Sequence, residues 1–139
     1  MSYLLDTCVV SELTKKQPDP CVIAWVEAQV ESSLYLSVLT LGELQRGVSR
    51  LKDHDRSATL QAWIDQDLAH RFVNRILPID YEVASYWGRL SGELARQGVV
   101  LPVTDSLIAA SAYIHHLIIV TRNVRDFGRC RIEVVNPWQ

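Results

Sequence analysis

This 139-residue sequence has few cysteines, no strong excess of one charge and no long apolar run. Its three cysteines are odd in number and far apart, which argues against a disulfide framework and against a four-thiolate zinc site. Fourteen Lys and Arg residues against sixteen Asp and Glu residues give a net charge of −2, so a nucleic acid or membrane partner must bind a local patch. No stretch approaches the roughly 18–20 apolar residues of a membrane helix, and the first residues do not resemble a secretory signal. We therefore expect a soluble, cytoplasmic protein without a membrane partner.

Internal repeats, low-complexity tracts and Gly/Ser linkers are also missing from the sequence. The chain length is usual for one domain, and the hydrophobic fraction of 48% with a charged fraction of 22% excludes a disordered chain. The sequence therefore predicts a single domain over residues 1–139.

Short apolar runs alternate with helical patterns along the chain. The apolar runs predict strands at residues 3–5, 34–38, 117–120 and 132–135. Helices are expected to begin at Pro20 and Thr40, to run through residues 60–72, to span Asp80 to Gly98, and to cover residues 107–114. The first helix would have an inner stripe of Val22, Ile23, Val26 and Val30. This alternation is typical of an α/β fold with a central, mostly parallel sheet between helices.

Four acidic residues lie near the ends of these strands or at the starts of helices: Asp6, Glu43, Asp105 and Asp126. Functional groups of parallel sheets gather beyond the carboxyl ends of the strands, so the predicted fold would bring these carboxylates together. Oxygen ligands without a well-placed His/Cys cluster favour Mg²⁺ or Mn²⁺ over zinc or copper. Such an ion polarises a phosphoryl oxygen and lowers the pKa of a bound water, as metal-assisted phosphodiester hydrolysis requires.

Each acid also has a purely structural explanation. Residues 40–43, Thr-Leu-Gly-Glu, have the pattern of a helix capping box. Asp105 would favour the dipole of the helix it begins, residues 123–126 would form a capped turn, and Asp6 would simply end a strand. Taken one at a time, these explanations compete with a functional role for each acid.

Four motifs in order along the chain carry a family resemblance. They are LDTCVVSE at residues 5–12, ELQRG at 43–47, PVTDSLIAA at 102–110 and TRNVRDF at 121–127. Together they resemble the PIN-domain ribonucleases, and most closely the FitB-like branch of the VapC toxins of type II toxin–antitoxin modules. The resemblance spans nearly the whole chain.

The resemblance implies an α/β/α sandwich in which the four acids surround one or two Mg²⁺ or Mn²⁺ ions. Asp6 and Asp105 match the family's metal ligands best, and Glu43 and Asp126 would complete the pocket. Thr121 and Asn123 match supporting polar positions, with loop capping as the alternative role of both. The implied activity is metal-dependent hydrolysis of RNA by an activated water. The implied partners are a cognate antitoxin, an RNA substrate and a second copy of the chain.

Cys8 departs from the family pattern, because the usual Asp-Thr-Asn reads Asp-Thr-Cys at residues 6–8. The change removes an amide that would orient Asp6, and a thiol is a weaker hydrogen-bond partner. A catalytically weak PIN-like module that only binds a partner or RNA is therefore an alternative. A small-molecule phosphohydrolase is a further one, although such a site would want a second Asp where Cys8 stands.

Two groups of basic residues are candidates for guiding a phosphate backbone toward the acids, with ordinary surface charge as the alternative. They are Arg46, Arg50, Lys52 and Arg56, and then Arg122, Arg125, Arg129 and Arg131.

Overall fold

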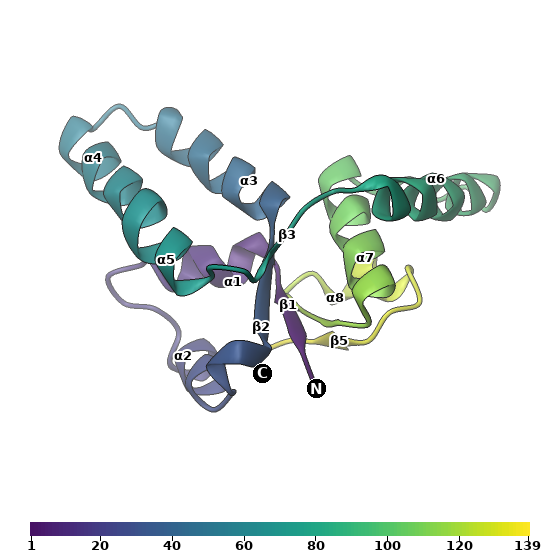
Figure 1. Cartoon of the computed structure of the whole chain (residues 1–139), viewed down its shortest axis with the longest axis horizontal. Helices are drawn as coiled ribbons and strands as arrows, with labels where there is room; N and C mark the ends of the chain where they lie inside the picture. Colours follow the sequence, from purple (N-terminus) through teal and green to yellow (C-terminus); the bar gives the residue numbers. More distant parts are fainter.

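The structure, a computed structural model, describes residues 1–139 and has a five-stranded sheet at its centre (Figure 1). The strands are β1 (Tyr3–Leu5), β2 (Leu34–Ser37), β3 (Ile76–Leu77), β4 (Ile118–Val120) and β5 (Val134–Val135). Their order is β3-β2-β1-β4-β5, and every neighbouring pair is parallel. The sheet predicted as mostly parallel is thus entirely parallel.

Eight α-helices, a 3₁₀ turn and a π-helical segment surround the sheet. The α-helices are α1 (Thr7–Glu12), α2 (Pro20–Glu27), α3 (Val38–Ser49), α4 (His54–Ala62), α5 (Ala69–Arg71), α6 (Tyr81–Arg96), α7 (Val103–His115) and α8 (Val124–Gly128). The 3₁₀ turn η1 (Glu31–Ser33) precedes β2, and the π-helical segment η2 (Trp63–Leu68) joins α4 to α5. None of the helices combines the length and apolar surface that crossing a bilayer requires.

The hydrophobic core lies in two clusters, one on each face of the sheet. Leu4 and its neighbour Leu5 are both fully buried but belong to different clusters, because successive side chains of a strand point to opposite faces. Helices α6, α7 and α8 supply the cluster around Leu4, whereas α1, α2 and η2 supply the cluster around Leu5. The fold is therefore the expected α/β/α sandwich.

Several predicted helix ends are confirmed. The Asp19 carboxylate caps α2 by accepting a hydrogen bond from the Cys21 backbone N–H at 2.8 Å, and Pro20 opens the helix. The Asp80 carboxylate caps α6 by accepting from the Val83 N–H at 3.0 Å. Gly98 follows the end of α6 with φ of +76°, a left-handed conformation that glycine adopts without strain.

Other predicted boundaries are wrong. Helix α3 begins at Val38 rather than Thr40, because the Ser37 hydroxyl caps it by accepting from the Leu39 N–H at 3.1 Å. The capping box predicted for Glu43 therefore does not form. Val30 lies beyond the end of α2 and is 71% exposed, so it is not part of the buried stripe. The predicted strands at 34–38 and 132–135 are shorter in the structure.

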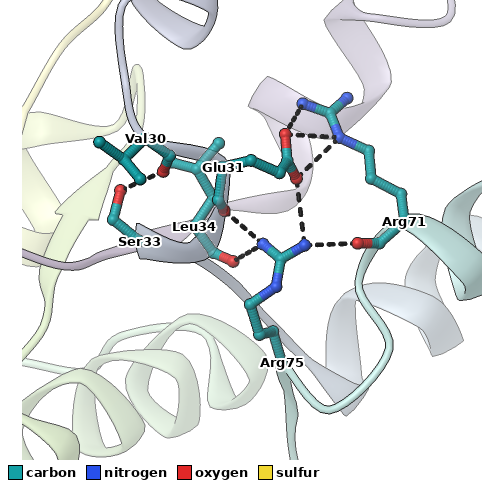
Figure 2. A network of polar contacts seen from close by, with 6 residues as sticks. All are labelled: Val30, Glu31, Ser33, Leu34, Arg71 and Arg75. Carbon is teal, nitrogen blue, oxygen red and sulfur yellow. Dashed lines mark hydrogen bonds and ion pairs between the residues drawn. The ribbon is translucent and has the colours of Figure 1, made fainter.

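Arg71 and Arg75, which precede β3, form a network of hydrogen bonds with Glu31 and with Leu34 at the start of β2 (Figure 2). The Arg75 guanidinium donates to the backbone carbonyls of Glu31 and Leu34 and to the Glu31 carboxylate. Arg71 donates to the same carboxylate at 3.0–3.3 Å. Both guanidinium groups lie within 5.3 Å of the Phe72 ring centroid. This network holds β3 beside β2, although β3 itself has only two residues.

Candidate active site

Asp6 occupies the carboxyl end of the central strand β1. Its carboxylate is buried and accepts hydrogen bonds from the Thr7 backbone N–H and from the Thr121 hydroxyl, both at 2.8 Å. Thr121 is fully buried and directly follows β4, the strand next to β1. Residues that follow two neighbouring strands therefore hold the Asp6 carboxylate in place, and the Thr121 hydroxyl also caps its own loop by accepting from the Asn123 backbone N–H at 2.9 Å.

Asp105 and Asp126 face one another across Asn123. Asp105 lies in the first turn of α7, and Asp126 lies on the short helix α8. The Asn123 amide donates to an Asp126 carboxylate oxygen at 3.1 Å and to an Asp105 oxygen at 3.4 Å. The Asn123 side chain caps no helix amide, so the loop-capping explanation is wrong for this residue and its amide links two acids instead.

Glu43 projects from α3 and meets α1 through a pair of threonines. The Thr7 hydroxyl donates to the Glu43 carboxylate and also contacts the Thr40 hydroxyl at 3.1 Å. The sequence analysis gave Thr7 and Thr40 no role in the site. Thr7 lies within the motif at residues 5–12, which is the one signal that would have drawn attention to it.

The four acids lie close enough together for the charges of three of them to act on Asp105. Burial, together with the nearby negative charges of Asp6, Glu43 and Asp126, raises the pKa of Asp105 to about 6. The ion pairs of the chain join Lys15 to Glu12 and both Arg71 and Arg75 to Glu31, and none involves the four acids. Neither predicted group of basic residues therefore neutralises the cluster.

The donor atoms of the cluster suit a hard cation, but their present arrangement does not enclose one. Carboxylate oxygens are the ligands that Mg²⁺ and Mn²⁺ prefer, and the mutual repulsion at Asp105 is the kind that a divalent cation relieves. No three His, Cys, Asp or Glu side chains are placed so that they could hold one ion together. The site thus fits such an ion chemically, and three-ligand binding would require side-chain rotation.

Cys8 faces Asp6 from the first turn of α1. Its sulfur lies 3.6 Å from an Asp6 carboxylate oxygen and 3.7 Å from the Thr121 hydroxyl oxygen. Burial and the Asp6 charge raise the pKa of the thiol, which keeps it protonated as a weak donor. Thr121 therefore provides the stronger hydrogen bond to Asp6, and Cys8 adds a weaker one where the family usually has an amide.

Most of the sequence matches one domain family. The model of the PIN domain matches residues 3–132, which include all four acids and both supporting residues. The chain is a PIN domain. Its four motifs thus belong to one family pattern, confirming the resemblance.

Relatives of this PIN domain match it over nearly their whole length. The VapC ribonuclease Y4jK of Sinorhizobium fredii is 32% identical over 136 residues, covering 98% of this chain and 97% of that protein. The toxin FitB of Neisseria gonorrhoeae is 34% identical over 135 residues, covering 97% of each chain. The crystal structure of FitAcB from the same organism has a TM-score of 0.94 at 34% identity and covers 99% of each chain. The similarity therefore extends over both core clusters and the acidic site.

Proposed function

We propose that this PIN domain is a Mg²⁺-dependent endoribonuclease and the toxin of a type II toxin–antitoxin pair. The observation that carries the proposal is the gathering of Asp6, Glu43, Asp105 and Asp126 without a neutralising cation from the chain. The names of two relatives, a VapC ribonuclease and the toxin FitB, support the choice of reaction and of biological role.

In this proposal the four acids have different roles in binding an ion and a water. Asp6 and Asp105 would bind the Mg²⁺ ion, and Glu43 and Asp126 would complete the pocket directly or through water. The ion supplies charge that polarises a phosphoryl oxygen and lowers the pKa of a water, and Mn²⁺ would substitute for it. The Thr121 hydroxyl fixes the orientation of Asp6, and the Asn123 amide fixes that of Asp105 and Asp126.

The proposal includes partners and a location. A cognate antitoxin would mask the acids, and an arginine side chain is well suited to pair with several carboxylates at once. RNA is the proposed substrate, a homodimer the proposed assembly and the cytoplasm the proposed compartment. These assignments rest on the family and on the names of its toxin members.

Cleavage of RNA by purified protein tests the proposal. We expect discrete cuts when antitoxin-free protein is incubated with total RNA in Mg²⁺ or Mn²⁺. The cuts should disappear with a chelator and with Asp105→Asn, a substitution that removes one acid without changing side-chain size. Cleavage that persists in the chelator or in the variant would contradict the metal-dependent mechanism.

A PIN domain that binds partners without cleaving RNA is the second candidate. Two observations favour it: no three ligands are gathered around one point, and Cys8 gives Asp6 only a weak thiol contact at 3.6 Å. Calorimetry with Mn²⁺ separates the two candidates. Binding that is lost in Asp6→Asn supports the nuclease, whereas a folded protein that takes up no Mn²⁺ supports the binding module.

A further inference from the structure

A hollow of about 180 Å³ opens beside Glu43 and is not used by the acidic site. It lies between α1, α3, α4 and η2, and Thr7 and Glu43 form part of its wall. Leu44, Leu60 and Trp63 line it with apolar surface. We call it the Trp63 pocket. Because Glu43 is one of the four acids and Thr7 donates a hydrogen bond to it, anything bound at the acids lies next to the pocket.

The size of the Trp63 pocket limits what it can hold. A cavity of about 150 Å³ is enough for benzene, whereas pockets for drug-sized ligands are about 300–1,000 Å³. The volume of the Trp63 pocket is close to the lower figure. It therefore suits one aromatic ring system, and the rest of a longer ligand would continue into an adjoining hollow of about 410 Å³ that shares Thr14, Arg56 and Leu60 with it.

The chemistry of the Trp63 pocket narrows the occupant further. It combines an indole ring, the exposed guanidinium of Arg56 and the carboxylate of Glu43. Proteins recognise unpaired bases by stacking them on aromatic or guanidinium planes and by hydrogen bonds to their edges. An aliphatic side chain would use only the apolar surface and would make no use of the indole face or of the Arg56 guanidinium.

Gly47 keeps the Trp63 pocket open. This glycine lies inside α3, where glycine costs up to about 1 kcal/mol relative to alanine. The backbone there does not need it, because Gly47 has no positive φ and an added Cβ would meet no atom within 4 Å. Any longer side chain at this position would instead reach into the pocket that Gly47 lines.

We propose that the Trp63 pocket binds one unpaired base of the RNA, next to the phosphate that lies at the acids. This inference rests on the proposed ribonuclease function and adds to it that the substrate is single-stranded at this position. The base stacks in the apolar part of the pocket, its edge faces Glu43, and the adjoining backbone phosphate faces Arg56.

Filling the pocket tests this inference. Binding of a short labelled oligouridylate is measured in the Asp105→Asn protein, which keeps the RNA intact, alongside a backbone oligomer that lacks bases. We expect Gly47→Leu to weaken oligouridylate binding about ten-fold, to the affinity of the base-free oligomer. Gly92→Leu is the matched control, because Gly92 lies on α6, also has open space around it and does not line the pocket.

Arg56→Gln provides a second variant, which removes the cation and leaves the apolar wall of the pocket intact. Losing one phosphate contact should reduce the slope of log affinity against log salt concentration by about 0.7. Arg96→Gln is its control, since Arg96 is exposed in the last turn of α6, belongs to neither basic group and does not line the pocket. Thermal unfolding of all four variants confirms that each is folded.

The results that overturn the inference are specific. Equal affinity of the oligouridylate and the base-free oligomer would do so, and so would a Gly47→Leu protein that binds RNA as well as its Gly92→Leu control. Weakened antitoxin binding by Gly47→Leu with unchanged RNA binding would assign the pocket to the protein partner instead. Failure of the pocket-intact protein to bind any RNA would instead contradict the proposed function itself.

Discussion

Among the four acids, the pKa of Asp105 is raised by burial and by the negative charges of the other three. In the folded protein its pKa is raised to about 6 from the ordinary 3.8, so folding favours its protonated form. This contribution to stability is fully present below about pH 4 and is lost as the pH rises through about 6. Gathering the four carboxylates therefore lowers the stability of the fold at neutral pH.

Asp105→Asn should therefore stabilise the protein in a chelator at neutral pH. We expect its free energy of unfolding to exceed that of the unmodified protein by about 1–2 kcal/mol at pH 8, after discounting for partial exposure, and the difference to vanish near pH 4. Urea unfolding at both pH values measures it. Asp67→Asn, on the exposed face of η2, is the control that should show no such pH dependence.

At the scale of single residues, the sequence predicted the acids but not all of their contacts. Asp6, Glu43, Asp105 and Asp126 were recognisable because each lies in a motif. The contact of Thr7 with Glu43 joins residues 36 positions apart, and it depends on how α3 packs against α1. Side-chain pairs of this kind are set by tertiary packing, which local patterns do not contain.

Ser37 caps the start of α3, whereas Glu43, six residues later, caps no helix amide. Ser37→Ala should lower the free energy of unfolding by about 1 kcal/mol, because it removes the cap of α3. Glu43→Gln should change it by less than about 0.5 kcal/mol, since Glu43 caps nothing, while abolishing RNA cleavage. A clear loss of stability in Glu43→Gln would restore the capping-box explanation. Urea unfolding and the RNA cleavage assay measure the two effects.

The two arginines of the network before β3 differ in exposure, because Arg75 is mostly buried and Arg71 is exposed. The Arg75 side chain is 15% exposed and that of Arg71 is 40% exposed. Arg75→Lys should cost about 2 kcal/mol, because an ammonium group cannot reach both backbone carbonyls and the Glu31 carboxylate at once. Arg71→Lys should cost less than about 1 kcal/mol, as for other exposed ion pairs. Equal costs in chemical unfolding would show that the network does not depend on fork geometry.

At the scale of elements, long patterns were predicted well and short ones poorly. Helix α6 has a cap, a regular apolar face and a terminating glycine, and its extent was predicted closely. Strand β3 was missed, because two residues are too few for any periodic signal and its pairing depends on Arg75. Helix α3 was predicted to start two residues late, because Val38 was assigned to the strand, whereas Ser37 ends β2 and caps the helix.

The whole molecule has two cores that share one sheet, so it should unfold as one unit. Leu4→Ala and Leu5→Ala make the same change to neighbouring residues that face different cores. Each should lower the free energy of unfolding by about 3–4 kcal/mol without splitting the transition. Circular dichroism and tryptophan fluorescence should report the same midpoint for each variant. Different midpoints would show that the two faces unfold separately.

The outermost strands of the sheet, β3 and β5, have only two residues each. A free sheet edge is a template on which another chain can extend the hydrogen-bond ladder, and very short edge strands leave little of that template. Copies of this domain should therefore have little tendency to aggregate by pairing their sheet edges. These short edges offer a protein partner little backbone on which to add a strand, so helix and loop side chains provide the better binding surface.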